Sequence, residues 1–262
     1  MSTIPLHDLV IRTMTEYLVG YNKTLVDLQM LNMRFYSIRD MFIKQLVLDG
    51  YTTSYAYVGQ PYGWNTVHKM VISFSFFDDV FALRRVHTII LIRCPNIHDV
   101  SPLKKVHKLL LIDCDNIEDV SALGGVHELL ISNCPKILDV SSLGNVHTLK
   151  LAYCNNLSDV SALNKVHTLE ISHCYGIHDV SALGSVHKLR LDCCLNIRNV
   201  SALGTVHDLT ILYGVIEDVS ALGSVQSLAI ISCHKIHDIS ALKNVPNLRI
   251  SGCLHIPDLY KN

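Results

Sequence analysis

Apolar side chains recur along residues 67–262 with a period of 20 residues. In the unit that begins at Val166, Leu169 and Ile171 alternate with polar neighbours, and this period of two predicts a short strand with one buried side. The side chains at the other apolar positions of the unit should face the same core; they are Val166, Cys174, Ile177, Val180 and Leu183. One unit alone would leave this core uncovered on both sides, so the pattern predicts units stacked one on the next.

Ten such units follow one another. Val-His opens eight of them, Val225-Gln226 and Val245-Pro246 open the other two, and the units that begin at 67 and 206 are one residue short. The shared pattern is V-H-x-L-x-L-x-x-C-x-x-I-x-D-V-S-A-L-x-x. It resembles the signature of leucine-rich-repeat proteins, with a ninth-position cysteine as in the cysteine-containing subclass and a tail similar to that of internalin repeats.

The resemblance implies an α/β solenoid, a leucine-rich-repeat coil with a parallel β-sheet on its concave face and short helical turns on its convex face. Ile43-Lys44-Gln45-Leu46-Val47-Leu48 fits the opening of a degenerate first unit that covers residues 43–66. We therefore expect a solenoid over 43–262, with ten regular units over 67–262, and a separate N-terminal segment over residues 1–42.

Three columns of polar or reactive residues repeat with the units. The aspartate at position fourteen, with the serine at position sixteen, is typical of a turn or cap before a one-turn helix. The cysteine column indicates small buried side chains rather than a disulfide framework or a zinc site, because C-x₂₋₄-C pairs are absent. The histidine column comes just before each strand, where a role in pH sensing or metal binding competes with simple stacking of the rings.

Composition excludes several classes of function. Hydrophobic residues make up 49% of the chain, formal net charge is −1, and no basic run stands out, so we expect neither a nucleic-acid nor a membrane partner. Nine cysteines, an odd number, fit reduced thiols in the cytoplasm or nucleus. No catalytic or phosphate-binding arrangement stands apart from the repeat, so we expect no enzyme activity, cofactor or metal.

The strand positions that point outward should form the binding face. An apolar patch is expected at the N-terminal end of the concave sheet, where it either meets a partner or packs under residues 49–66. Aromatic and charged residues follow along the sheet, a composition common in interface hot spots. The candidate partner-binding residues are Ile90, Ile92, Leu110, Ile112, Leu130, Tyr153, Glu170, His173, Arg190, Asp192 and Tyr213.

Residues 4–42 do not repeat, and their apolar spacing predicts two or three short amphipathic helices. Ile4-Pro5, Met14-x-x-Tyr17-Leu18 and the stretch from Leu25 to Ile38 resemble an F-box. F-box proteins with leucine-rich repeats are substrate receptors of Skp–cullin–F-box ubiquitin ligases, and such near-identical repeats are similar to those of F-box/LRR proteins in large DNA viruses and amoebae. The resemblance implies that a Skp-type adaptor would contact Ile4, Pro5, Met14, Leu18, Leu25 and Leu28.

Two functions remain open at this point. The chain is either a substrate receptor of a Skp–cullin–F-box-type ligase that recognises its target on the concave face, or a free-standing protein–protein interaction scaffold whose N-terminal helices only cap the solenoid. If the source is viral, the scaffold would act on host proteins in the host cytoplasm.

Overall fold

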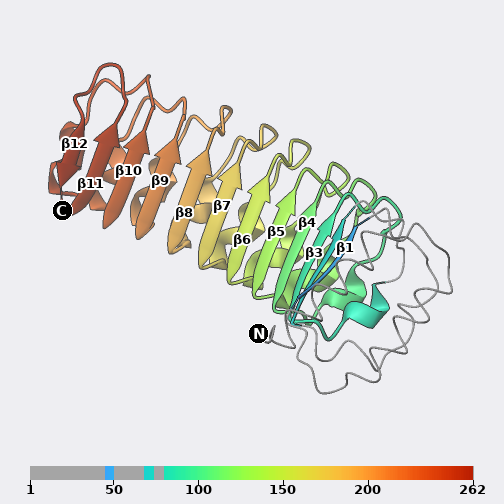
Figure 1. Cartoon of the computed structure of the whole chain (residues 1–262). Helices are drawn as coiled ribbons and strands as arrows, with labels where there is room; N and C mark the ends of the chain where they lie inside the picture. Colours follow the sequence, from blue (N-terminus) through green and yellow to red (C-terminus); the bar gives the residue numbers. More distant parts are fainter. Residues whose placement is uncertain (1–44, 50–67, 74–79, 262) are drawn as a thin grey trace, which may run out of the picture.

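The computed structural model describes residues 45–49, 68–73 and 80–261 (Figure 1). Within these residues, twelve strands form one sheet in the order of the sequence, and β1 to β11 pair in parallel. The strands are β1 Gln45–Asp49, β2 Lys69–Ser73, β3 Thr88–Ile92, β4 Lys108–Ile112, β5 Glu128–Ser132, β6 Thr148–Ala152, β7 Thr168–Ser172, β8 Lys188–Asp192, β9 Asp208–Leu212, β10 Ser227–Ile231, β11 Asn247–Ser251 and β12 Leu259–Lys261.

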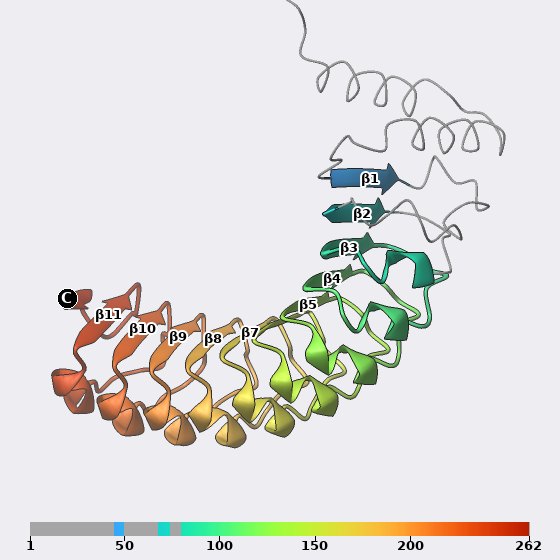
Figure 2. The ribbon, with the colours of Figure 1, turned by 90° about the horizontal axis from the view of Figure 1, so that it is seen from below.

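Single turns of 3₁₀-helix lie on the other side of the coil from the sheet. Seen from below, the strands line the inside of an arc and the helical turns its outside (Figure 2). The predicted solenoid, with a concave parallel sheet and convex helical turns, is therefore confirmed. The turns are η3 Phe81–Leu83, η4 Ser101–Leu103, η5 Ser121–Gly125, η6 Ser141–Asn145, η7 Ser161–Lys165, η8 Ser181–Ser185, η9 Ser201–Thr205, η10 Ser220–Ser224 and η11 Ser240–Asn244.

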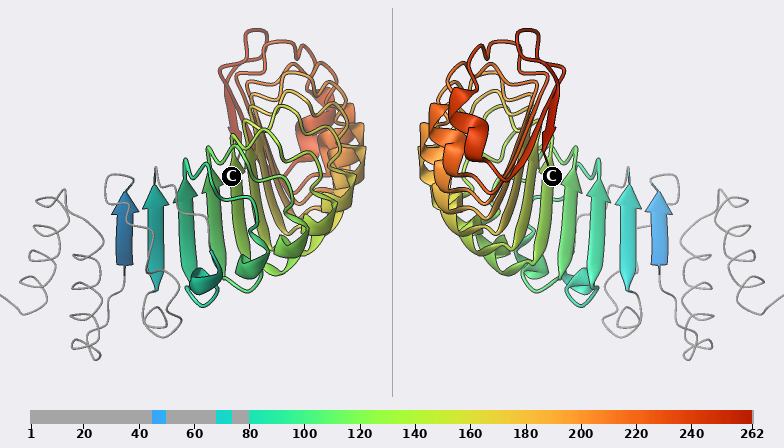
Figure 3. Two further views of the ribbon diagram at one scale, coloured as in Figure 1. Left: turned by 90° about the vertical axis from the view of Figure 1, so that its right-hand side faces the viewer. Right: turned by 90° about the vertical axis from the view of Figure 1, so that its left-hand side faces the viewer.

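One hydrophobic core runs through the stacked units. Figure 3 shows the sheet on one side of the coil and the helical turns on the other. In the unit that begins at 166, the strand residues Leu169 and Ile171 and the turn residue Leu183 are fully buried. The same positions are buried in each neighbouring unit, and the strand register keeps like residues side by side, for example Leu149 against Leu169. Each unit thus completes the core of the next, as the repeat pattern predicts.

The last unit departs from the regular pattern. Strand β12 runs antiparallel to β11, with Ile250 opposite Leu259, where the sequence predicted a tenth regular unit. Tyr260 stands at the position that starts the helical turn in the other units, where eight units have serine and the unit that begins at 67 has Phe81. Because Phe81 begins the turn η3, an aromatic residue at this position does not by itself account for the strand. Asp258 accepts a hydrogen bond from the Gly252 N–H at 2.9 Å instead of leading into such a turn. Strand β12 therefore covers the edge of β11, which would otherwise expose unpaired backbone groups.

Strand β1 lies within the region expected to open the degenerate first unit, and it pairs with β2 in the parallel register of the regular strands. The boundary proposed between residues 42 and 43 lies outside the described residues and stays a prediction.

Candidate binding surface

An apolar patch covers the outer face of β3, β4 and β5. Inward neighbours such as Leu91 are fully buried, whereas the outward side chains remain half-buried. The register places Ile90 opposite Leu110 and Leu110 opposite Leu130, so the patch is continuous across three strands. Its members are the five predicted residues Ile90, Ile92, Leu110, Ile112 and Leu130.

A charged cluster follows the apolar patch along the sheet, made of Lys150, Glu170, Arg190 and Asp192. The Lys150 ammonium lies 2.7 Å from the Glu170 carboxylate, and Arg190 contacts Glu170 at 3.5 Å and Asp192 at 2.9 Å. Ion pairs at this level of exposure contribute little to stability. Their effect is to hold the Arg190 guanidinium in one orientation on the concave face.

Two more ion pairs cross between adjacent strands near their beginnings. Lys108 contacts Glu128 at 2.7 Å, and Lys188 contacts Asp208 at 2.8 Å. The hydrogen bond from Lys108 lowers the pKa of the Glu128 carboxyl. Like the contacts of Glu170 with Lys150 and Arg190, these pairs join residues 20 positions apart, because the repeat places them side by side.

Aromatic residues occupy the turn that follows β6, β7 and β9. Tyr153 and His173 stack with ring centroids 4.7 Å apart, and Tyr153 and Tyr213 are about half exposed, at 48% and 52%. These predicted partner-binding residues border the charged cluster on the side where the strands end. The stacked pair was not foreseen, although the 20-residue spacing of Tyr153 and His173 could have indicated it.

This turn position has a left-handed backbone in eight successive units, with φ between 49° and 55°, and none of the eight residues is glycine. The conformation directs the backbone N–H into the next unit: the Tyr153 N–H donates to the Ser172 carbonyl at 3.0 Å and the His173 N–H to the Asp192 carbonyl at 2.9 Å. The sequence gives only a partial sign of it. Asp113, Asn133, His173 and Gly252 are residue types that favour this conformation, whereas Tyr153, Cys193 and Tyr213 are not.

The histidine ladder, defined as His68, His87, His107, His127, His147, His167, His187 and His207, lines the edge where the strands begin. All eight side chains are exposed. Successive ring centroids lie 4.3–4.6 Å apart, close to the spacing of the strands that carry them. Partial burial, and then the neighbouring imidazoles, lower the pKa of His87 and of His167.

The cysteine column is buried, as predicted, and all nine thiols of the chain are free. The Cys174 thiol lies 3.3 Å from the Ser172 carbonyl and 3.5 Å from that of Leu151, one unit back. Burial raises the pKa of Cys194 to about 12 and that of Cys233 to about 11. Cys193 belongs to the left-handed turn position instead and is partly exposed.

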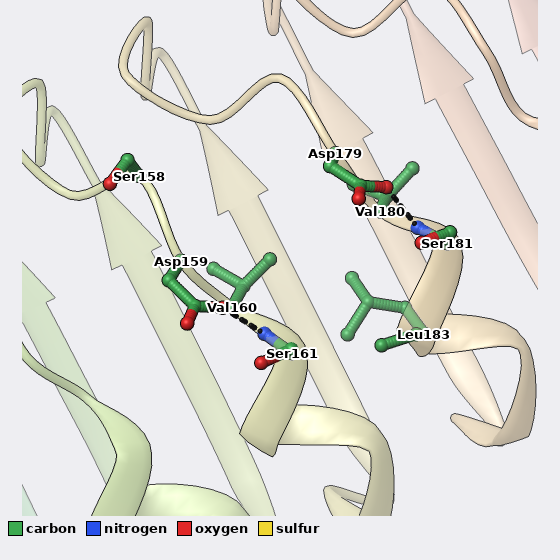
Figure 4. A pocket seen from close by; sticks show the side chains of 9 residues that line it. Ser158, Asp159, Val160, Ser161, Asp179, Val180, Ser181 and Leu183 are labelled. Atoms are coloured by element: carbon green, nitrogen blue, oxygen red, sulfur yellow. Dashed lines mark hydrogen bonds between the residues drawn. The ribbon is translucent and has the colours of Figure 1, made fainter.

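The aspartate column supports the helical turns, as the sequence predicts. Asp159 and Asp179 each accept a hydrogen bond from the backbone N–H of the serine two residues ahead, at 2.8 Å (Figure 4). That bond lowers the pKa of both carboxyls. Asn199 makes the same bond at 2.9 Å without a charge.

A pocket of about 260 Å³ lies between these two turns, lined by residues 158–161 and 179–183. Its aspartates serve the backbone, so it offers no chemistry beyond the fold. Among the described residues, no group of three or more histidine, cysteine, aspartate or glutamate side chains converges on a possible metal position. Nor does any helix of that part of the chain have the length and apolar character to cross a membrane.

The adaptor-binding candidates lie outside the described residues. They are Ile4, Pro5, Met14, Leu18, Leu25 and Leu28, and nearly all of the 49–66 segment that could cover the apolar patch also lies there. These assignments stay predictions.

Comparison with known proteins identifies the fold. No protein-family model and no curated protein matches the chain. Among solved structures, internalin F from Listeria monocytogenes superposes over 73% of this chain and 68% of its own, with 21% identity and a TM-score of 0.54. Internalin C2 from the same organism covers 64% of this chain and 81% of its own, at 19% identity and a TM-score of 0.49. With the coil and the repeat register, the first likeness establishes that the chain folds as a leucine-rich-repeat solenoid.

Proposed function

We propose that the solenoid is a non-catalytic scaffold that binds another protein on its concave face. The observation that supports this proposal is the contrast between the inward and the outward positions of the strands. Inward positions hold the same few apolar residues in every unit, whereas outward positions change from the apolar patch to the charged cluster. Apolar surface beside an oriented arginine and exposed tyrosines has the composition of a protein interface.

For the biological role, we propose a substrate receptor of a Skp–cullin–F-box-type ubiquitin ligase. The support is the F-box resemblance of residues 4–42, which would bind the adaptor while the concave face holds the target. The second candidate is a free-standing scaffold, directed at host proteins if the source is viral. It is favoured by the need of every solenoid for a cap over its terminal unit, a need that N-terminal helices alone would meet.

Adaptor binding separates the two roles. The full chain is titrated with a purified Skp-type adaptor, alongside the double variant Pro5→Ala/Leu18→Ala and the matched control Arg190→Ala in the charged cluster of the solenoid. A receptor binds the adaptor, loses binding in the double variant and keeps it in the control. Absence of binding, or binding that the double variant leaves intact, would exclude the receptor role and leave the scaffold.

The concave face is tested separately by charge reversal. Arg190→Glu breaks the charged cluster, whereas Lys165→Glu makes the same change on η7 on the convex side. With a purified partner, we expect Arg190→Glu to weaken binding about 30-fold, the size of one hot-spot residue, and Lys165→Glu to leave the Kd unchanged. Equal effects of the two reversals would contradict recognition by the concave face.

A further inference from the structure

The histidine ladder holds its imidazoles at a fixed spacing. The His107 N–H donates to the His87 carbonyl at 3.1 Å, and the His127 N–H donates to the His107 carbonyl at the same distance. The residue after each histidine extends the bonding into the sheet, as where the Thr168 N–H donates to the His147 carbonyl at 2.9 Å. These backbone hydrogen bonds therefore place the rings of successive units next to one another, and each ring remains exposed to solvent.

Local contacts also orient some of the rings. The Nδ1 atom of His87 lies 3.1 Å from the Thr88 hydroxyl oxygen, and that of His167 lies 3.3 Å from the Thr168 hydroxyl oxygen. A histidine whose Nδ1 is held in this way directs Nε2 outward as the atom that can bind a ligand. Threonine follows the histidine in only some units, so along the rest of the ladder it is the register of the backbone that places neighbouring imidazoles side by side at the edge of the sheet.

We propose that adjacent pairs of the histidine ladder bind divalent transition-metal ions of the Zn²⁺, Ni²⁺ and Cu²⁺ class, each ion held by two imidazole nitrogens and by water. Imidazole is a preferred ligand of these ions, with metal–nitrogen bonds of about 2.0–2.1 Å. Two nitrogens on one ion then lie roughly 3–4 Å apart. The ring centroids are 4.3–4.6 Å apart, and two pairs already tilt, by 32° for His87 and His107 and by 33° for His167 and His187.

Rotation of exposed side chains closes the remaining difference, so the site needs no change in the backbone. Since no three ligating groups converge in the described residues, the proposal is confined to sites with two imidazoles. Such sites are independent of the concave face and of the proposed receptor role. Eight rings supply at most four pairs that share no histidine.

The test compares two variants that each lose four ladder histidines. The alternate variant carries glutamine at 87, 127, 167 and 207, which leaves no two ladder histidines adjacent. The block variant carries glutamine at 147, 167, 187 and 207, which leaves His68, His87, His107 and His127 as neighbours. Gln226 occupies the ladder position in a natural unit, so glutamine suits the site. All chains carry His255→Gln, because His255 stacks on His237 at 4.2 Å, and none carries a histidine tag.

Binding of Ni²⁺ alone is measured by equilibrium dialysis at pH 7.5, with circular dichroism to compare the folds. Paired sites predict that the block variant keeps about half of the bound Ni²⁺ and that the alternate variant binds about 100-fold more weakly, because the second imidazole no longer adds to the first. Equal binding by the two variants would show single-histidine sites and overturn the proposal, as would absence of binding to the parent chain. Cu²⁺ electron paramagnetic resonance on the parent chain gives a second readout: two coordinated nitrogens support the pair, and one contradicts it.

Discussion

At the scale of single residues, the left-handed turn position is the costliest feature of the backbone. Residues such as Tyr153 and Cys193 adopt φ of 55° and 51°, a conformation that costs non-glycine residues of order 1 kcal/mol or more. It persists because the N–H of this residue must reach the carbonyl of the next unit, as in the bond from Cys193 to Leu212 at 3.0 Å.

Relieving that strain should stabilise the protein. Asparagine tolerates the left-handed region better than most residues and does not add the chain entropy of glycine. We expect Cys193→Asn to raise the free energy of unfolding by about 1 kcal/mol and Cys193→Val, with its branched Cβ, to lower it by about the same amount. Urea unfolding followed by circular dichroism measures both. A valine variant as stable as the asparagine variant would contradict the strain.

Differences in burial should also make the thiols react at different rates. Cys193 is partly exposed, while the column cysteines are buried, and a reagent in solution reaches an exposed thiol far faster than a buried one. We expect a chromogenic disulfide reagent at pH 8 to label one thiol per folded chain and all nine after denaturation. Cys193→Ser should abolish the labelling of the folded chain. Rapid reaction of several thiols without denaturant would show that the column is accessible.

At the scale of the element, the shortened unit shows why the cysteine column is interrupted. Gly214 takes the place of the column cysteine in the unit that begins at 206, which is one residue short. A Cβ at this position would lie 2.9 Å from the Ile211 Cγ2 atom and 3.4 Å from the Cys233 thiol. In the shorter coil the backbone at Gly214 therefore lies too close to Ile211 for a side chain to be added without a shift of its neighbours.

Adding a side chain there should therefore destabilise the unit. We expect Gly214→Ala to lower the free energy of unfolding by about 1–3 kcal/mol through overpacking. Gly125→Ala is the matched control, since its Cβ would meet only the Lys104 carbonyl at 3.4 Å, and it should change stability by less than about 0.5 kcal/mol. Thermal unfolding compares the two, and a harmless Gly214→Ala would contradict the tight packing of this unit.

The elements differ in how far the sequence predicts them. Alternation at Leu169 and Ile171, repeated every 20 residues, determines the strands, their register and the buried column, because each is a direct result of periodicity. The left-handed turn is not predicted, because the hydrogen bond that imposes it reaches into the next unit and residues such as Tyr153 and Cys193 do not favour that conformation. The antiparallel strand β12 is not predicted for a related reason. Asp258 keeps the repeat pattern, but its carboxylate accepts a hydrogen bond from the Gly252 N–H instead of one from a residue two positions ahead.

At the scale of the whole molecule, periodicity also limits what could be predicted of the binding surface. It places the outward side chains of β3–β5 and β6–β8 on one face, which the structure shows. It does not indicate which outward charges pair, because the contacts of Arg190 with Glu170 and Asp192 depend on side-chain orientation. Nor does it identify the partner, since the inward residues that define the fold carry no information about the target.

Because the same residues recur in every unit, their small effects on stability add up along the solenoid, and the dependence of stability on pH is one example. For His87 and His167 the folded pKa lies below that of the unfolded chain, so the unfolded chain binds more protons below about pH 7. Protons therefore stabilise the unfolded chain more than the folded one, and the free energy of unfolding falls as pH falls through the range of histidine titration. The aspartates, of which Asp159 and Asp179 are examples, also have lowered pKa values, and their contribution is lost only below about pH 4.

We therefore expect the Tm of the metal-free chain, with a chelator present, to fall in two stages, first between pH 7.5 and 5.5 and again below pH 4. The alternate glutamine variant removes His87 and His167 and leaves the remaining ladder imidazoles without adjacent like charges, so its first stage should shrink while the second is unchanged. Scanning calorimetry across this pH range measures both stages in both chains. A Tm that stays constant from pH 7.5 to 5.5 in the parent chain would show that repulsion along the ladder does not affect folding.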